Sequence, residues 1–260
     1  MHCKPLHTIM SFVFFLILVS LACTTSQPTA APTNIPEPIA TQTALPTATK
    51  TSRPSPTPSP TQTPNLAATE RVQEFNAEVQ EYFDKGYLPT IEGRAIELDD
   101  FRYEYAYLGR YSSPVVVESA SDFFLSAHFR WISALENSDT SGCGFIFGLQ
   151  PNFDHYAVFL DRTNVEFRIR NLELGYSTRV KPTRVMGQVN FAYPAEADFK
   201  LIVNGAHAYV LVNGEIVSEY TLLQGRSVHG DLGLTVLSGT NKDYGTRCEM
   251  TDLRLWLPNE

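Results

Sequence analysis

The chain has 260 residues and a formal net charge of −8, a length that suits one domain of roughly 200 residues with extensions. Residues 1–64 carry three basic residues and one acidic residue, so residues 65–260 carry −10. An acidic surface repels phosphate backbones and anionic lipid headgroups. The composition therefore argues against nucleic acid as a partner and against docking of the domain itself on a membrane.

Residues 1–22 have the pattern of an export signal. Lys4 precedes an apolar run over residues 9–22, which is shorter than the ~20 residues that a membrane span needs but suits the apolar core of a signal peptide. The run ends in Ser20-Leu21-Ala22-Cys23, which resembles a bacterial lipobox, although the preferred Leu stands one position nearer the Cys than usual. The resemblance implies lipidation of Cys23. The alternative is an ordinary cleavable signal, or an uncleaved anchor, with a chance Cys.

Residues 23–64 consist mainly of Thr, Pro, Ser and Ala and contain almost no large apolar side chain. Such a composition cannot form a core and favours extended conformations, which at ~3.1 Å per residue reach ~120 Å. We interpret this segment as a disordered tether. With the lipid anchor, it predicts an extracytoplasmic protein held at the membrane and displayed on a bacterial cell surface.

Residues 65–86 predict one amphipathic helix, with Asn65 as the N-terminal cap and Gly86 as the C-terminal stop. Its apolar stripe contains Val72, Phe75, Val79, Tyr82 and Phe83. We expect this stripe to pack on the edge of the domain that follows. The alternative is a partner-binding or coiled-coil helix, for which barely three heptads are short.

Residues 87–260 predict an all-β domain. Runs of alternating apolar and polar character, separated by turn signals, place strands at 93–98, 103–108, 115–118, 123–133, 142–149, 156–161, 165–170, 176–180, 199–203, 208–212, 215–220, 232–237 and 247–257. Asn213-Gly214 is the strongest hairpin signal. About a dozen short strands favour an antiparallel β-sandwich over a parallel α/β sheet.

The succession of strands and turns over residues 197–217, 230–236 and 251–257 resembles the second half of a concanavalin A-like jelly roll. This superfamily includes lectins, laminin G-like modules and glucanases. Within it, the chain is similar to the keto-disaccharide-hydrolase-like domains of bacterial lipoproteins. The resemblance covers about residues 90–258 and implies a jelly-roll β-sandwich; it supports the fold better than any activity.

Two cysteines belong to the domain, because Cys3 lies in the signal and Cys23 at the lipobox. An even number in an exported domain favours a disulfide between Cys143 and Cys248, with two buried free thiols as the alternative.

The sequence supplies no catalytic residues. Retaining glucanases of the resembled superfamily carry Glu-x-Asp-x-x-Glu on a strand, and here Glu97-Leu98-Asp99 is followed by Arg102 where the second Glu would stand. The proton donor is therefore missing. Gly-x-Ser-x-Gly, His-Glu-x-x-His and P-loop motifs are also absent from the sequence. We expect a non-catalytic domain.

Alternation predicts a polar shelf on the middle strands. If these strands share the concave sheet, their outward side chains form a surface suited to sugar hydroxyls, although any solvated sheet face carries such residues. The candidate ligand-binding residues are His128, Arg130, His155, Arg168, Arg170 and Trp256. Trp256 faces away from the core-filling leucines, so it is either a platform for a sugar ring or lies under the helix; we favour the helix. A bulge near Thr251 reconciles this parity with an inward Cys248.

The resembled superfamily often binds calcium through loops such as residues 238–246. This loop holds one Asp and one Asn, which are too few oxygen ligands to argue a site. We therefore predict no cofactor, with calcium as the alternative.

The sequence as a whole predicts a lipid-anchored cell-surface protein that displays a carbohydrate- or envelope-binding β-sandwich. One alternative is a glycoside-processing enzyme of the keto-disaccharide hydrolase type. The other is a structural protein-interaction module.

Overall fold

The computed structural model describes residues 66–259 except 137, 172–175, 181, 186, 188, 190–192 and 224–226. All described residues belong to one compact unit, Thr61–Glu260. The predicted signal peptide, Cys23 and the tether at 23–64 lie outside them. Within the described part of the chain, no helix combines the length and apolar composition that a membrane crossing requires.

Sheet A is an antiparallel sheet with the strand order β1-β15-β5-β11-β12-β13, and β2 also pairs with β15. Its strands are β1 (Gly93–Glu97), β2 (Phe101–Tyr105), β5 (Phe123–Ser133), β11 (Ala195–Asn204), β12 (His207–Val212), β13 (Glu215–Thr221) and β15 (Thr246–Pro258). The hairpin predicted at Asn213-Gly214 joins β12 to β13, and both residues have positive φ, 50° and 84°, as a tight two-residue turn requires.

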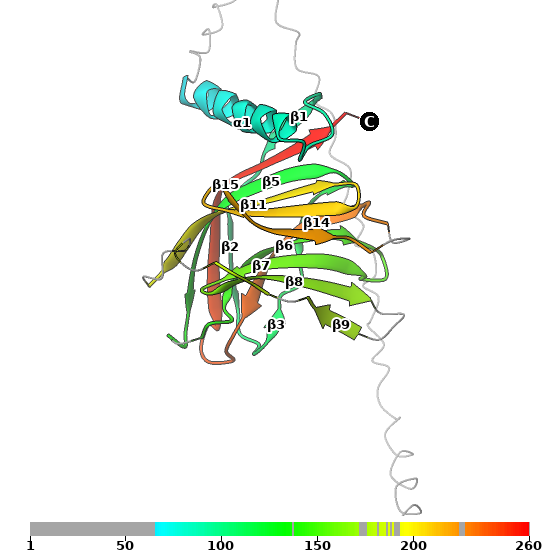
Figure 1. The fold of residues 1–260 in the computed structure, drawn as a ribbon. Coiled ribbons are helices and arrows are strands. Elements are labelled where there is room, and N and C mark those ends of the chain that lie inside the picture. Colours follow the sequence, from blue (N-terminus) through cyan, green and yellow to red (C-terminus); the bar gives the residue numbers. More distant parts are fainter. Residues whose placement is uncertain are drawn as a thin grey trace, which may run out of the picture. The chain divides into compact units, whose positions relative to one another are not determined.

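Sheet B packs against sheet A and has the order β10-β8-β7-β6-β14-β3, with β4 on β14 and β9 on β8. Its strands are β3 (Arg110–Tyr111), β4 (Val115–Ala120), β6 (Gly142–Leu149), β7 (His155–Asp161), β8 (Asn164–Asn171), β9 (Tyr176–Arg179), β10 (Thr183–Arg184) and β14 (Gly230–Ser238). The two-residue strands β3 and β10 were not predicted, because two residues show no periodicity. The predicted antiparallel jelly-roll β-sandwich preceded by a helix is confirmed (Figure 1).

The main core lies between the sheets and is built by alternation. Every second residue of β5, from Phe123 to Trp131, faces the inward side chains of β6, β7 and β8. Aromatic rings link the two layers: the Phe129 and Phe145 ring centroids lie 5.1 Å apart, and those of Phe123 and Phe147 lie 5.9 Å apart. The register of β15 on β5 shifts between Thr251 and Arg254, which confirms the predicted bulge.

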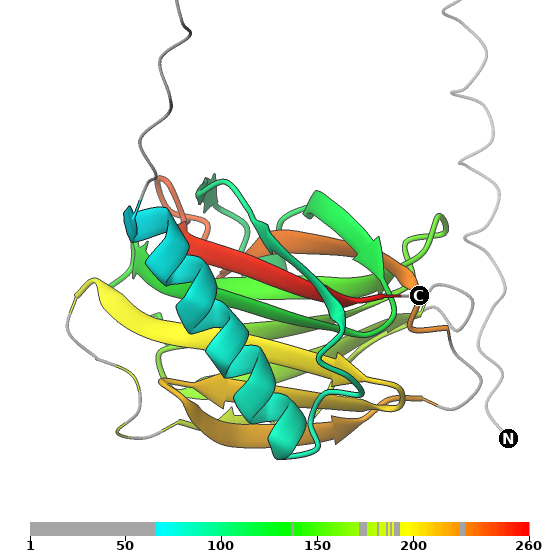
Figure 2. The same ribbon diagram turned by 90° about the horizontal axis from the view of Figure 1, so that it is seen from above.

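Helix α1 (Leu66–Asp84) covers the outer face of sheet A, as Figure 2 shows from above. Phe75, Val79 and Tyr82 are buried against sheet residues that include Phe124 and Trp256. Lys200 on β11 adds an ion pair to Glu78 of the helix, with its Nζ 3.0 Å from Oε1. The prediction that the helix packs on the domain is confirmed, but it covers the outer face of sheet A rather than the edge of the domain, and Val72 and Phe83 of the predicted stripe remain exposed.

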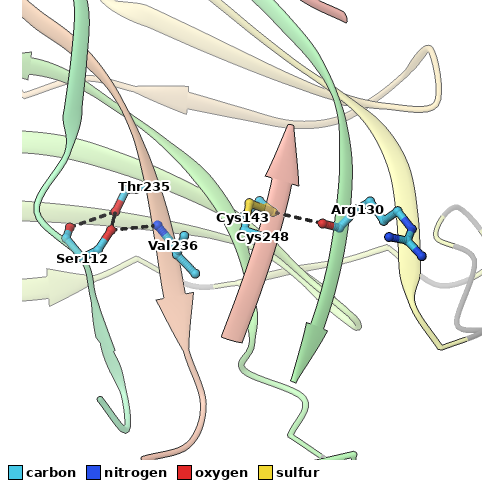
Figure 3. The surroundings of a disulfide bond; sticks show 6 residues. All are labelled: Ser112, Arg130, Cys143, Thr235, Val236 and Cys248. Atoms are coloured by element: carbon cyan, nitrogen blue, oxygen red, sulfur yellow. Dashed lines mark hydrogen bonds between the residues drawn. A yellow bond between two sulfur atoms is a disulfide. The ribbon is translucent and has the colours of Figure 1, made fainter. Parts of the chain in front are cut away.

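The predicted disulfide is confirmed. It joins Cys143 on β6 to Cys248 on β15, so it links sheet B to sheet A through the core, and neither residue has exposed surface (Figure 3). The same figure shows Ser112, which holds the segment between β3 and β4 to β14: its Oγ accepts a hydrogen bond from the Val236 amide at 3.2 Å, and the Thr235 hydroxyl donates to its carbonyl at 2.9 Å.

Candidate functional site at one end of the sandwich

The predicted shelf residues lie on different sheets. His128 and Arg130 belong to β5 of sheet A, whereas His155 belongs to β7 and Arg168 and Arg170 to β8, both in sheet B. The outward faces of two packed sheets point away from each other, so these residues cannot contact one small ligand together. The expectation of one continuous shelf is therefore wrong. Alternation shows which side of a strand is buried, but not which sheet the strand joins.

The polar face of sheet A is a set of ion pairs beside α1. His128 Nδ1 lies 2.8 Å from Asp198 Oδ1 on the neighbouring strand. Arg130 contacts Glu196 at 3.0 Å and Glu249 at 3.2 Å. These cross-strand pairs engage the polar atoms of His128 and Arg130 with other side chains of the same face.

On sheet B, Arg168 compensates a buried carboxylate. Glu166 has no exposed surface, and its two oxygens pair with Arg168 and with Arg179, whose Nη2 lies 2.7 Å from Oε2. The Arg168 guanidinium also lies over the rings of Tyr111 and Phe159, 5.5 and 5.4 Å from their centroids. Arg168 thus has a structural role that alternation did not predict.

His155, predicted to face outward, is only 2% exposed. Its Nε2 lies 2.8 Å from the Tyr111 hydroxyl, and its Nδ1 donates to the Phe153 carbonyl at 2.8 Å. The prediction that His155 presents its side chain at the surface is wrong, because β3 brings Tyr111 over this part of sheet B. Arg170 lies opposite His155 in the β7–β8 register.

Trp256 is 2% exposed and lies in the apolar cluster beneath α1. This confirms the favoured interpretation that it packs under the helix. Trp256 has no open face on which a sugar ring could stack, so the platform interpretation is wrong.

Two adjoining hollows open at one end of the sandwich, where β6 and β15 end and β14 begins. The first has a volume of about 560 Å³ and is lined by residues that include Thr90, Arg94, Ser121, Asp122, His229 and Asn259. The second has a volume of about 380 Å³ and is lined by residues that include Gln150, Pro151, Phe153, His229 and Asp231. Both volumes fall in the usual range of small-molecule sites. His229 lines both hollows, so they are neighbours.

The loop between β6 and β7 presents Phe153 at the second hollow. Phe153 is 61% exposed and has φ 64°, a left-handed conformation that is rare and costly for a bulky side chain. Its amide donates to the Gln150 carbonyl at 2.8 Å, and its carbonyl accepts the bond from buried His155. The fold therefore holds an exposed aromatic ring in a strained position.

The polar groups around His229 are fixed from both sides. Ser121 Oγ lies 3.3 Å from His229 Nδ1, and Gln150 Nε2 donates to the His229 carbonyl at 2.6 Å. Asp122 Oδ1 accepts a hydrogen bond from the Gly205 amide at 2.7 Å, and Arg94 Nη2 lies 3.2 Å from Glu118 Oε2. With its Nδ1 turned to Ser121, His229 offers Nε2 to a ligand.

The hollows offer binding groups, and each is lined by one carboxylate. The carboxylate that lines the first is Asp122 and the one that lines the second is Asp231. Among the described residues, no group of three or more His, Cys, Asp or Glu side chains could hold a metal ion. In the loop considered for calcium, the Ser238 hydroxyl donates to the Thr240 carbonyl at 2.7 Å.

Sequence reasoning missed Phe153 and His229; the one signal was an aromatic residue after Pro151-Asn152 in a hairpin loop.

The sequence matches no family model and no curated protein. Among solved structures, the chain is similar to a carbohydrate-binding module, CBM66, from Bacillus subtilis, with 13% identity and TM-score 0.41, over 62% of this chain and 94% of that one. It is similar to sheep galectin-11 with 12% identity and TM-score 0.37, over 58% and 99%. It is also similar to a Bacillus licheniformis β-glucanase with 10% identity and TM-score 0.39, over 55% and 69%. At these values the likeness adds nothing to the topology described above.

Proposed function

We propose that this is a lipid-anchored bacterial surface protein whose β-sandwich binds carbohydrate in the two hollows that share His229. The observation that carries the proposal is Phe153, an exposed aromatic ring held at positive φ on the rim of a hollow. Strained residues persist where the surrounding structure over-determines them, and they cluster at ligand sites. The apolar face of a sugar ring stacks on an aromatic face, while its hydroxyl groups need donors and acceptors.

His229 and Asp231 supply those polar groups beside Phe153. The first hollow extends the site with Arg94, Ser121 and Asp122, enough room for a second sugar unit. Binding is favoured over hydrolysis because a glycosidase needs two carboxyls about 5–9 Å apart across one bond. Each hollow is lined by one carboxylate, and Asp122 is already bonded to the Gly205 amide.

The test uses the unit Thr61–Glu260, which contains the whole described core. A glycan array identifies a ligand, and titration calorimetry then compares wild type with Phe153→Gly and Phe153→Tyr. Glycine accepts the positive φ without strain, so Phe153→Gly removes the ring while keeping the melting temperature. We expect affinity to fall at least tenfold, about 1.4 kcal/mol, for Phe153→Gly and to be retained in Phe153→Tyr.

A matched control is Ile216→Ala, which removes an exposed apolar side chain on β13. It should leave binding unchanged. If the array finds no glycan for the wild type, or if Phe153→Gly binds as tightly as wild type, the proposal is wrong.

A further inference from the structure

A second aromatic surface lies along the edge strand β2. Phe101, Tyr103 and Tyr105 alternate on this strand, and Tyr107 continues the alternation just beyond it. Tyr103 pairs with Cys248 in the β2–β15 register, so these side chains take the face of sheet A that points toward the core. β2 is an edge strand that also contacts β14, so it runs along the margin between the two sheets (Figure 1).

The rings of this row pass from the core to solvent. Phe101 is 7% exposed and belongs to the core, and Tyr105 is partly buried against it, whereas Tyr103 is 45% and Tyr107 is 55% exposed. The Phe101 and Tyr103 rings lie 6.1 Å apart with an angle of 21° between their planes, and the Tyr105 and Tyr107 rings lie 6.5 Å apart, also at 21°. Both pairs are therefore close to parallel.

Polar groups flank the row. The Arg110 guanidinium lies 5.0 Å from the Tyr107 ring centroid, and among the described residues it makes no ion pair. Beside Tyr105, Gly245 packs so closely that a Cβ there would lie 2.1 Å from the Tyr105 carbonyl oxygen. Tyr244 precedes this glycine in the chain, and the Arg247 guanidinium lies 4.7 Å from its ring centroid.

The row is far from the two hollows. Tyr105 pairs with Thr246 at the start of β15, whereas Leu257 at the end of the same strand lines the first hollow. At about 3.3 Å per residue, the 11 steps from Thr246 to Leu257 span about 36 Å. A ligand of one or two sugars therefore cannot reach both places.

We propose that Tyr103, Tyr105 and Tyr107 form a second carbohydrate site, a shallow platform for an uncharged polysaccharide chain. Exposed rings such as Tyr103 and Tyr107, with the partly buried Tyr105 between them, suit successive sugar units, which stack their C–H faces on aromatic faces, and Arg110 donates hydrogen bonds to hydroxyl groups. The polymer is uncharged because a domain of charge −10 repels an acidic one. Closing the margin of the sandwich does not account for rings that stay half exposed.

The platform proposal depends on the proposed function only in taking carbohydrate as the class of ligand. A polymer that touches both sites gains from the second contact being intramolecular, which raises avidity by roughly 10²–10⁴ without further contacts. Short oligosaccharides occupy only one site and show no such gain.

The experiment is affinity electrophoresis of Thr61–Glu260 in gels that contain a mixed-linkage β-glucan, a β-2,6-fructan or a galactan. The variants are Tyr103→Ala/Tyr107→Ala for the platform and Phe153→Gly for the hollow, with Phe83→Ala as a control that removes an exposed aromatic ring, 37%, on α1 and outside the row. We expect the platform variant to lose at least tenfold in affinity for the retained polymer while the control keeps it. Tyrosine nitration of the wild type gives a second measurement, in which the polymer should protect Tyr103 and Tyr107.

The outcomes separate the two proposals. If the platform variant weakens and Phe153→Gly does not, the platform stands, and the hollow is judged by its own titration with the glycan that the array identifies. If Phe153→Gly alone weakens, and the polymer does not protect the row, the platform is wrong. Should the platform variant fail to fold, nitration of the wild type decides. If none of the three polymers retards the wild type or protects the row, the platform proposal is overturned.

Discussion

Removing the inter-sheet disulfide should lower the free energy of unfolding by about 2–4 kcal/mol. The bridge closes a loop across a sequence separation of 105 residues, for which the chain-entropy model gives about 4.7 kcal/mol. The smaller figure is expected because the unfolded chain retains some structure without the bridge, so it loses less entropy when cross-linked than a random coil does.

The assay is urea unfolding of Thr61–Glu260 as wild type, as Cys143→Ala, as Cys248→Ala and as the double variant. Each single variant breaks the same bond, so each should lower the free energy of unfolding by about as much as the double variant does, and not by half as much. The slope of unfolding free energy on urea concentration should also rise, because the unfolded chain without a cross-link exposes more surface.

Two results would refute this reasoning. One is a loss below ~1 kcal/mol in the double variant, which is outside the usual range for such a bridge. The other is additive single losses, which would mean that each cysteine stabilises the fold through its own packing. Thiol titration of unfolded wild type without reductant should find neither cysteine reactive.

Three further comparisons concern buried charges and the anchor. Burial raises the pKa of Asp161 to about 6 from 3.8, so its carboxylate destabilises the fold above pH 6, and the free energy of unfolding should rise as the pH falls from 7.5 toward 4. Asp161→Asn should therefore add about 1–3 kcal/mol to the free energy of unfolding at pH 7.5 and little at pH 4. A lower free energy of unfolding for this variant at pH 7.5, measured by urea unfolding, would contradict this. Arg168→Ala should lower the free energy of unfolding by about 2–3 kcal/mol, because Glu166 is left buried with one partner. His128→Ala, on the solvent side of sheet A, should change it by no more than ~0.5 kcal/mol. Equal melting temperatures for the two variants would refute this difference. Cys23→Ser should abolish metabolic labelling with a fatty acid, and an unlabelled wild type would end the anchor proposal.

Local patterns predicted the strands well but not their place in the sandwich. The strands at Phe123–Ser133 and Gly142–Leu149 begin and end where alternation placed them. Alternation has the same form in both sheets, however, so His128 and Arg168 were placed on one surface. The sheet that a strand joins is decided by its pairing with strands far away in the sequence, and the pattern of a single sequence does not show this pairing.

Burial of the outer faces depended on segments with no recognisable pattern. His155 is covered through Tyr111, which belongs to a strand of two residues. Trp256 could be assigned because the helix that covers it has a clear apolar stripe. An outward position therefore does not by itself predict exposure, because a segment as short as β3 can cover it.

The way in which sheet B is covered also explains why both proposed sites lie away from the middle of a sheet. At Gly144 a Cβ would lie 2.3 Å from the Phe159 ring, so this ring lies flat against the outer face of β6. Arg168 lies over Phe159, and its Nη1 donates to the Gly109 carbonyl at 3.4 Å. The chain thus fills the outer face of sheet B, and α1 covers much of that of sheet A. The end of the sandwich at Phe153 and its margin along β2 are open to a ligand, because loops and an edge strand leave aromatic rings exposed there.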